Sequence, residues 1–405
     1  MVRGLAAAGA LVVSLDSVVN VAFPAMAEAF AVPPEAMRWV IICYVGTYAV
    51  MAFVGGAAAD RLGHGRVFTA GLALSVAAFV LGALAPTLPS MLVARMVQGL
   101  GGGLVYGTAP SLGTLGVPAA ARGRALGFVN AGMGVGFAAG PLLAGLLIEV
   151  AGWRAIFWAR VPCALAVLVC TLIASVDGSA TPQPRRGARL AHDHRAATPR
   201  LLATGDMPRG PVLRVSILAF LANAGIFAVW LLAPFHLILS RGLSAGAASL
   251  LFVLTPLGTA LAALPAGRLA DRIGTRVPMA LGLAIEAVGL GFLGGTTATT
   301  PLALVAAALF VAGFGVGLFQ VPNMAAIMAE FPPSQQGVAG GVSFLARTLG
   351  IVAGAAVFAQ LVAWRRGAVG FDRAFAEAFM VATVMVAAAA LAAMPWRRYT
   401  RGRPI

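Results

Sequence analysis

The sequence predicts an all-α integral membrane protein of twelve transmembrane helices, arranged as two pseudo-symmetric six-helix bundles. Three observations predict this class. Hydrophobic residues make up 60% of the chain and charged residues only 10%, whereas soluble domains have about 45–50% apolar and about 25% charged residues. Long apolar stretches fill most of the chain, and one charged turn occurs twice. In water such a chain would expose large apolar patches, so its solvent is lipid.

Each helix is placed by an apolar stretch of about 20 residues, the length that spans a bilayer. In the first half these stretches cover residues 5–27, 37–59, 67–86, 90–115, 124–149 and 153–175. In the second half they cover residues 211–240, 245–270, 277–296, 300–328, 337–364 and 372–394.

The polar segments divide the chain into two halves. Residues 176–210 are rich in Arg, Pro, Ala and Thr, a composition that favours a disordered cytoplasmic linker. We therefore expect an N-terminal bundle over residues 1–175, a C-terminal bundle over residues 211–396 and a basic tail over residues 397–405.

A charged turn follows the second helix of each half. It has the sequence GAAADRLGHGR from Gly56 to Arg66 and GRLADRIGTR from Gly267 to Arg276. Asp60 and Asp271 are separated by 271 − 60 = 211 residues. Internal repeats are a recurrent feature of secondary transporters. We therefore expect each half to carry the same cytoplasmic hinge.

Glycines extend the repeat into the fourth and fifth helices of each half. Their positions in the two halves differ by 214 residues: Gly99, Gly101 and Gly103 match Gly313, Gly315 and Gly317, and Gly127, Gly136 and Gly140 match Gly341, Gly350 and Gly354. Glycine lets helix backbones approach closely in lipid, so tight packing alone accounts for any single position. The shared offset indicates that the two halves are built alike.

The positions of the basic residues predict how the chain is oriented in the membrane. The formal net charge is +15, and all 28 basic residues are arginines. Most of them fall on one side of the predicted spans, which is the positive-inside pattern. We expect a multi-pass protein of the inner membrane with both termini in the cytoplasm, its arginines close to anionic lipid head groups. This distribution argues against nucleic acid as a partner.

Several motifs together resemble one transporter family. The charged turns are similar to the loop between helices 2 and 3 of the major facilitator superfamily and to its copy between helices 8 and 9. RMVQG, from Arg95 to Gly99, is similar to the family element R-x-x-Q-G. GFAAGPLLAG, from Gly136 to Gly145, resembles the exporter element G-x-x-x-G-P-x-x-G-G, with Ala144 in place of a glycine.

Motifs in the first, second and sixth helices narrow the resemblance to the multidrug:proton antiporter branch. They are LDSVVNVAFP, WVIICY and GWRAIFWARVP. That branch is usually built with more helices than this chain can hold, and it usually has Asn at the position of Arg160. The resemblance implies proton-driven export of a lipophilic or amphipathic small molecule by alternating access. It implies no cofactor, and a monomer suffices because one chain holds both halves.

Four polar residues are candidates for the proton and substrate pathway. Asp16 lies in the middle of the first span, where a charge costs about 2.5–3.5 kcal/mol, and Asn20 shares its helix face. Arg95 and Gln98 share a face of the fourth helix. Arginine stays charged and can hold a carboxylate ionised. The resemblance makes these residues a proton relay, whereas packing would make Asp16 a hydrogen-bonded polar group and Arg95 a snorkelling arginine.

Three more titratable or charged residues lie within spans. Arg347 in the eleventh helix is a candidate for the cavity. Glu286 in the ninth helix is a lipid-side acid, a partner of a nearby cation or a second proton site. His236 follows Pro234 in the seventh helix and titrates near neutral pH, which suits either a gate hydrogen bond or a proton carrier.

Aromatic side chains are the candidates for the substrate cavity. Spacing alone does not separate aromatic residues of a cavity from those that face lipid. The candidates are Tyr44, Tyr106, Trp230 and Phe319.

The charged turns are also predicted to form a conformational latch. Asp60 would accept hydrogen bonds from a helix N-terminus of the other half, where the dipole favours an anion, and Arg124 would supply a counter-charge. The alternative is a topology signal with a tight turn. The latch residues are Gly56, Asp60, Arg61, Gly63, Arg124, Gly267, Asp271, Arg272 and Gly274.

A hinge is predicted in the fifth helix. Gly136, Gly140 and Pro141 are its residues, because Pro lacks the N–H donor and breaks the helix locally. Carbonyls freed in this way are tolerated only inside protein or a cavity. A static kink is the alternative.

Rival functions are weighed by the motifs they need. No G-x-x-x-x-G-K-[ST] element for ATP occurs in the sequence, and no H-E-x-x-H cluster for a metal or a catalytic centre. A dedicated metabolite exporter, an uptake symporter and a non-transporting sensor or scaffold stay open. The Gly140-Pro141 element favours export over uptake, since its resemblance is to exporters.

Overall fold

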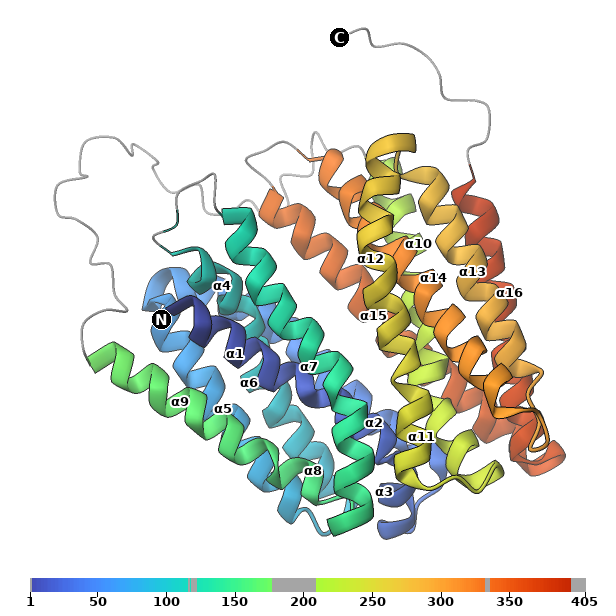
Figure 1. The fold of residues 1–405 in the computed structure, drawn as a ribbon. Coiled ribbons are helices and arrows are strands. Elements are labelled where there is room, and N and C mark those ends of the chain that lie inside the picture. The colour runs from blue at the N-terminus through green and yellow to red at the C-terminus, as the bar shows by residue number, and fades with distance from the viewer. Residues whose placement is uncertain (1, 116, 118–121, 177–208, 332–335, 395–405) are drawn as a thin grey trace, which may run out of the picture.

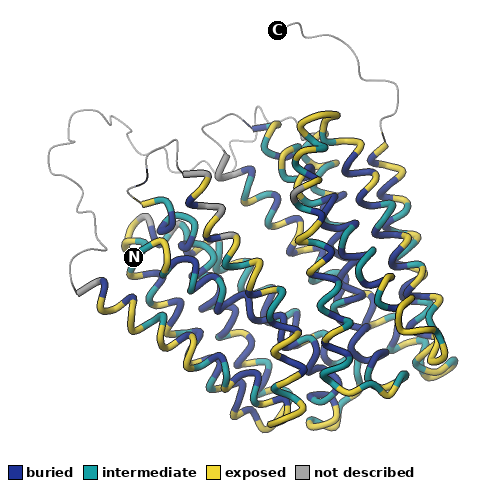
Figure 2. The backbone as a smooth tube through the Cα atoms, viewed as in Figure 1, coloured by how far each residue is buried: buried dark blue, intermediate teal, exposed yellow. Residues whose placement is uncertain are grey.

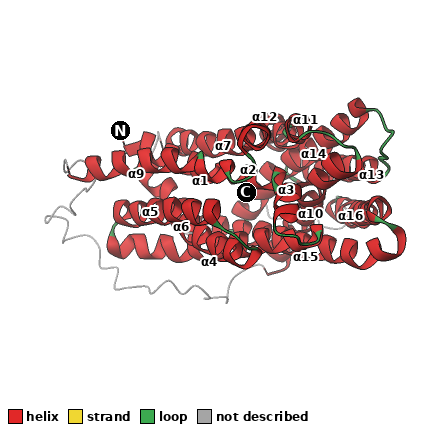
Figure 3. Cartoon of the chain, turned by 90° about the horizontal axis from the view of Figure 1, so that it is seen from below, coloured by secondary structure: helices red, strands yellow, loops and turns green. Residues whose placement is uncertain are grey.

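We describe a computed structural model of the chain, in which residues 2–115, 117, 122–176, 209–331 and 336–394 are placed. The predicted linker, apart from its ends, and the predicted basic tail lie outside these described residues. Figure 3 shows helices and connecting loops throughout the described part of the chain, without a strand.

The N-terminal half begins with an interrupted helix. This first span consists of α1 (Val2–Ser14), a 3₁₀ turn η1 (Leu15–Ser17), α2 (Val18–Val21) and α3 (Phe23–Ala29). A second 3₁₀ turn, η2 (Pro34–Met37), precedes α4 (Arg38–Leu62). The remaining helices are α5 (His64–Leu84), α6 (Leu88–Thr114), α7 (Arg122–Ala151), α8 (Ala155–Trp158) and α9 (Arg160–Val176).

The C-terminal half repeats this order. Its first span is α10 (Arg209–Phe235), which ends in a π-helical turn η4 (His236–Ser240). The remaining helices are α11 (Ala245–Phe252), α12 (Leu254–Ile273), α13 (Arg276–Gly294), α14 (Leu302–Ala329), α15 (Gln336–Val369) and α16 (Phe371–Ala393).

The predicted fold class is confirmed. Within the described residues, 11 helical segments are long and apolar enough to cross a membrane. The twelfth expected span is α6, which has 27 residues but is rich in glycine and carries Arg95. Most of its glycines and its arginine are buried against neighbouring helices, so a less apolar helix is tolerated there.

Repeated glycines place equivalent helices in contact in the two halves. A Cβ at Gly99 would lie 2.7 Å from the Tyr44 carbonyl of α4, and one at Gly313 would meet the Thr255 carbonyl of α12. Gly101 packs in the same way on α5, and Gly315 on α13. The fourth and tenth spans therefore each lie wedged between two helices that only glycine lets approach so closely.

The two bundles lie side by side (Figure 1; Figure 3). We call the end where α1 begins and α16 ends the open end, and the end where α3 and η2 lie the closed end. The bundles meet around the closed end and diverge toward the open end (Figure 1). Buried residues lie along the inner faces of the helices of each bundle and where the bundles meet (Figure 2).

Candidate functional site

The first span has two acidic residues, Asp16 and Glu28, and its helix is interrupted at Asp16. The 3₁₀ turn Leu15–Ser17 carries Asp16 at its centre, and the side chain of Asp16 is 11% exposed. The interruption lies about halfway along the span, as the sequence predicts for Asp16. A buried charge at this depth requires a partner.

Arg95 of α6 supplies that partner. Its Nη1 and Nη2 donate to Oδ1 and Oδ2 of Asp16 at 2.6 and 2.8 Å, and its Nε donates to the Val40 carbonyl at 3.1 Å. Gln98 Nε2 also donates to Asp16 Oδ1, at 2.6 Å. Charge-assisted bidentate pairs of this kind are strong and directional. The structure thus brings together Asp16, Arg95 and Gln98, three residues predicted for one pathway.

Arg160 completes the cluster and was not predicted as a site residue. It begins α9, directly after the break at Ala159, and its Nη1 lies 3.2 Å from Asp16 Oδ1. Its guanidinium group covers the ring of Phe79 at 4.0 Å. Its Nε and Nη2 are buried without a hydrogen-bond partner among the described residues. An arginine within an apolar stretch is the signal in the sequence that identifies it.

An aromatic cluster lies beside these charges. The guanidinium group of Arg95 lies 4.2 Å from the centroid of Tyr44, whose ring stacks on Tyr48 at 5.6 Å. Tyr48 contacts Tyr106 at 5.5 Å within the same bundle and Phe344 of α15 at 5.3 Å in the other. The cluster therefore bridges the two bundles.

The hydroxyl of Tyr106 ties the cluster to the interrupted helix, since it shares a hydrogen bond of 2.8 Å with Ser14 Oγ. Tyr44 and Tyr106 are predicted cavity residues, whereas Tyr48 and Phe344 are not. Tyr48 follows Tyr44 by one helical turn, a spacing that places both on one face.

Other predicted pathway and cavity residues lie outside this cluster or at its edge. Arg347 is exposed on α15, one turn after Phe344, and its charge acts on Tyr48 of the cluster. Asn20 is half-buried, and its Nδ2 donates to the Ser17 carbonyl at 3.4 Å. Trp230 packs on Phe252 at 5.2 Å, within the C-terminal bundle. The expectation for Phe319 was wrong, because its ring is fully buried in the hydrophobic core and does not line a cavity.

Glu286 is completely buried in the C-terminal bundle. Its exposed fraction is 0%, and neither carboxyl oxygen makes a well-formed hydrogen bond among the described residues, although the backbone N–H of Ile226 acts on the carboxyl group. A Cβ at Gly225 of α10 would lie 3.2 Å from Glu286 Oε1 and 3.4 Å from Leu290 Cδ1. The side chain therefore points into the apolar interior and not toward lipid, which excludes one of the alternatives that the sequence left open.

His236 lies at the closed end, inside the C-terminal bundle. Its ring stacks on Phe375 with centroids 4.4 Å apart. Nε2 is 3.3 Å from Thr296 Oγ1, and Nδ1 is 3.9 Å from the exposed carboxylate of Asp372. These contacts join helices of one bundle, so the structure places His236 in the packing of that bundle.

The predicted latch lies at the open end. Gly63 and Gly274 end α4 and α12 with φ of 93° and 80°, so glycine is required at both turns. Arg61, Arg124, Asp271 and Arg272 are exposed. The side chain of Asp60 lies outside the described part of the structure. Gly56 and Gly267 lie against α6 and α14 in matching positions.

The predicted hinge forms a different structure from the one expected. α7 continues as a helix through Pro141, so the expected local break is absent. Proline leaves the carbonyl four residues earlier without its N–H donor, which is the carbonyl of Phe137. Ser17 Oγ donates to that carbonyl at 3.1 Å. The helix therefore continues because the turn that carries Asp16 satisfies the freed carbonyl.

Contacts between the bundles at the closed end were not predicted. The N–H of Gly246, at the start of α11, donates to Glu149 Oε1 at 2.8 Å. Arg38 Nη1 donates to Gln360 Oε1 at 2.8 Å, and Arg366 Nε lies 3.2 Å from Glu35 Oε1. Each pair joins one bundle to the other.

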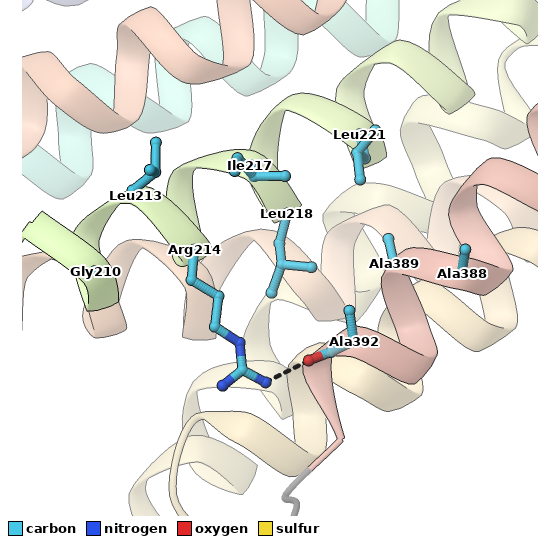
Figure 4. Close-up of a pocket in the computed structure, with 9 residues that line it drawn as sticks. All are labelled: Gly210, Leu213, Arg214, Ile217, Leu218, Leu221, Ala388, Ala389 and Ala392. Atoms are coloured by element: carbon cyan, nitrogen blue, oxygen red, sulfur yellow. Dashed lines mark hydrogen bonds between the residues drawn. The ribbon is translucent and has the colours of Figure 1, made fainter.

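A groove of about 360 Å³ lies elsewhere, between the open ends of α10 and α16 (Figure 4). Leu213, Leu218 and alanines of α16 line it, and Arg214 donates to the Ala392 carbonyl. Leu213 is 60% exposed, so the groove opens on the flank of the bundle. It is separate from the Asp16 cluster.

The profile of the Major Facilitator Superfamily matches the chain in two overlapping stretches, residues 5–247 and 215–404. Among curated proteins, the riboflavin transporter RibZ of Clostridioides difficile is 24% identical over 88% of this chain and 86% of that protein. The multidrug resistance protein Stp of Mycobacterium tuberculosis is 27% identical over 88% of this chain and 74% of that protein. The tetracenomycin C resistance and export protein of Streptomyces glaucescens is 27% identical over 92% and 77%.

Solved structures share the fold. A bacterial homologue of the human lysosomal transporter Spinster superposes with a TM-score of 0.77 at 16% identity, over 97% of this chain and 94% of the other. The nucleoside transporter NupG superposes with a TM-score of 0.75 at 14% identity, over 98% and 100%.

Proposed function

Because this chain belongs to the Major Facilitator Superfamily, we propose that it exports an amphipathic small molecule in exchange for protons. The chain is a multi-pass membrane transporter of that family, and the exchange is our proposal. One observation carries it: the buried carboxylate of Asp16 lies in an interrupted helix between two arginines and beside the aromatic cluster that bridges the bundles.

The charge state of Asp16 determines how tightly the neighbouring side chains are held against the 3₁₀ turn. In its ionised form Asp16 accepts four N–H donations from Arg95, Gln98 and Arg160. Protonation removes the negative charge and with it the attraction that draws both guanidinium groups to the 3₁₀ turn. Ser17 of that turn holds the Phe137 carbonyl of α7, so a change at Asp16 is passed to a second helix of the bundle.

The aromatic cluster is the proposed binding surface. Tyr44, Tyr48, Tyr106 and Phe344 offer ring faces and hydroxyl groups at the level of Asp16. Such a surface suits a planar molecule with polar groups, since aromatic pairs stack and hydroxyls accept or donate hydrogen bonds. Relatives that are named for riboflavin and for tetracenomycin C export support this substrate class.

The proposed orientation follows from the arginines. The open end holds the arginine-rich turns, so it faces the cytoplasm by the positive-inside rule. The structure then corresponds to a state that receives substrate from inside. To release it outside, the contacts of Glu149, Arg38 and Arg366 at the closed end must separate, and the charged turns at the open end must approach one another as the predicted latch.

Proton movement in liposomes tests the proposal. Purified protein is reconstituted with a pH-sensitive dye, and candidate amphipathic compounds are added to the wild type and to Asp16→Asn. We expect substrate-triggered proton flux in the wild type and none in the variant, because Asn cannot take up a proton. Flux that survives in Asp16→Asn contradicts the assignment of the coupling site, and absence of flux with every compound contradicts proton exchange.

A further inference from the structure

The cluster around Asp16 contains more positive than negative charge. Within the described residues, Asp16 is the one carboxylate within ion-pair distance of either Arg95 or Arg160. All three side chains are buried: Asp16 is 11% exposed, and Arg95 and Arg160 are each 3% exposed. One positive charge is therefore left without a counter-charge inside the protein, and burying an unpaired charge is costly.

The hydrogen bonds assign the excess charge to Arg160. Arg95 uses all three of its nitrogens, and it faces Asp16 end-on with Nη1 and Nη2. Arg160 donates to Asp16 with Nη1 alone, at the longer distance of 3.2 Å. Asp16 already accepts four N–H groups, which is about the capacity of a carboxylate. In this geometry Asp16 accepts only Nη1 of Arg160, and the rest of the guanidinium group is left without an acceptor among the described residues.

The two nitrogens that lack partners form one edge. Nε and Nη2 lie along the same edge of the planar guanidinium group, where their N–H groups point in parallel, and both are buried without a partner among the described residues. This edge matches the two oxygens of a carboxylate, which arginine binds through parallel N–H···O bonds. Arg160 also contacts the face of Phe79, at 4.0 Å, which supplies no hydrogen-bond acceptor.

We propose that the Nε–Nη2 edge of Arg160 binds an acidic group of the transported molecule, and that the substrate is an amphipathic aromatic anion. The inference rests on the proposed transport function and names its substrate class. The aromatic cluster would take the ring system, while Arg95 and Gln98 keep Asp16 paired when substrate occupies Arg160. In this proposal the two arginines have different roles: Arg95 pairs with Asp16, and Arg160 binds the substrate.

Equilibrium binding to the purified protein in lipid nanodiscs tests this without any proton gradient. The probes are 1-naphthoate and 1-naphthamide, which share a ring system but differ in charge. We expect 1-naphthoate to bind the wild type at least about tenfold more tightly, the range of a charge-assisted hydrogen-bonded pair. Arg160→Asn should abolish the preference, so that naphthoate binds no more tightly than the amide.

Two further variants separate binding from folding. Arg160→Lys keeps the charge but loses the parallel edge, so it should restore only part of the naphthoate preference. Arg373→Asn removes one charge at an exposed position of α16 and should bind both probes like the wild type. Melting temperatures of all variants identify any that fail to fold.

The proposal is overturned if the wild type does not prefer naphthoate, including the case in which neither probe binds. It is equally overturned if Arg160→Asn keeps the preference. Repeating the titrations at low and high chloride distinguishes a site for the substrate anion from a site for an inorganic anion. Chloride that displaces no probe supports a substrate site. Chloride that binds at Arg160 while the wild type shows no preference for naphthoate contradicts it. If both probes bind as expected but the protein shows no proton flux, the anion site at Arg160 is supported and only the proton-exchange mechanism is rejected.

Discussion

At the scale of the residue, the buried charges of the N-terminal bundle depend on one another. Arg95 gives Asp16 two short hydrogen bonds and also binds the Val40 carbonyl of α4. Removing one partner of a buried pair leaves a charge without compensation. Replacing Asp16, Arg95 and Arg160 together removes all the charge of the cluster. The stability of the cluster is therefore expected to be strongly non-additive.

We predict that Arg95→Gln destabilises the protein by about 3–5 kcal/mol, because Asp16 keeps a buried charge with only Arg160 to face it. The triple variant Asp16→Asn/Arg95→Gln/Arg160→Gln, which removes all three buried charges, should recover a large part of that loss. Unfolding of the purified proteins, followed by intrinsic tryptophan fluorescence, measures both. Losses that simply add in the triple variant would contradict the pairing.

Glu286 leads to the opposite expectation. Its carboxyl group is fully buried among apolar groups such as Leu290 and Val386, without a well-formed hydrogen bond among the described residues. A carboxyl group in such surroundings is most stable in its neutral form. Replacing an unsatisfied polar group by an apolar one of similar shape is close to neutral or stabilising.

We therefore predict that Glu286→Met raises or preserves the melting temperature and leaves proton-coupled transport intact. Melting followed by light scattering and flux in liposomes are the two measurements. A variant that folds as well as the wild type but loses proton flux would assign a second proton site to Glu286 and contradict this expectation.

At the scale of the element, α7 and the first span are joined by complementary defects. Pro141 frees the Phe137 carbonyl, and Ser17 of the 3₁₀ turn supplies the missing donor. Gly140 makes this possible, because a Cβ there would collide with Ser17 Oγ. The hinge motif and the turn that carries Asp16 are therefore one structural unit, although Pro141 and Asp16 are 141 − 16 = 125 residues apart.

We predict that Gly140→Ala lowers stability by about 1–3 kcal/mol, the usual cost of overpacking, and slows transport, because the new methyl group displaces the Ser17 hydroxyl. Gly134→Ala on the same helix is the matched control, since a Cβ there meets no atom within 4 Å. Thermal unfolding and flux compare the two. Equal behaviour of both alanine variants would show that the close approach at Gly140 is of no consequence.

Much of the fold at this scale could be predicted from the sequence. Helix positions follow from hydropathy, because lipid requires about 20 apolar residues per span. Turn glycines such as Gly63 and Gly274 follow from the repeated motif, and their positive φ explains them. The repeated glycines of α6 and α14 predicted close helix contacts, which the structure shows.

The site could be predicted only in part. Asp16, Arg95 and Gln98 could be grouped, since charges within a span must face a partner. Tyr48, Phe344 and the role of Arg160 could not, because they depend on how each helix is rotated about its axis. Phe319 was misplaced for the same reason. Rotation is decided by packing between helices, and a hydropathy pattern that is apolar on every side carries little information about it.

At the scale of the whole molecule, the two bundles are held together by polar contacts at the closed end. Glu149 accepts the Gly246 N–H at the start of α11. A carboxylate at a helix N-terminus is favoured by the exposed N–H groups and by the helix dipole. Under the proposed mechanism this contact must break each time substrate leaves, so its strength sets the balance between the two states.

We predict that Glu149→Gln shifts the population toward a state in which the closed end is open. Spin labels at the exposed positions Val150 and Leu239, in a background without the native cysteines, report the separation of the bundles. The variant should show more of the longer distance. Glu28→Gln, at an exposed position of the same end, is the control, and an equal shift in both variants would contradict a specific role for Glu149.

The charge of the substrate determines how the membrane potential acts on the cycle. Moving one charge across the potential is worth about 2.3 kcal/mol per 100 mV. If an anion leaves while a proton enters, two charges move in the same electrical sense, and the exchange gains about 4.6 kcal/mol per 100 mV. We therefore predict that an inside-negative potential, set with potassium and valinomycin, strongly accelerates export of 1-naphthoate from liposomes. Arg373→Asn should respond like the wild type, and Arg160→Asn should export little naphthoate at any potential.

The dependence of the rate on potential also identifies the coupling. Exchange moves two charges in each cycle, whereas passage of the anion alone moves one. A substrate anion at Arg160 lies close to Asp16, and its negative charge favours proton uptake by Asp16. A transporter that carried the anion and the proton together in one direction would move no net charge. Naphthoate transport that ignores the potential yet carries protons would thus reject exchange and establish symport at the same site. A cycle that moves two charges requires that Asp16 is ionised whenever the substrate is bound, and the bidentate pair with Arg95 is the contact that satisfies this requirement.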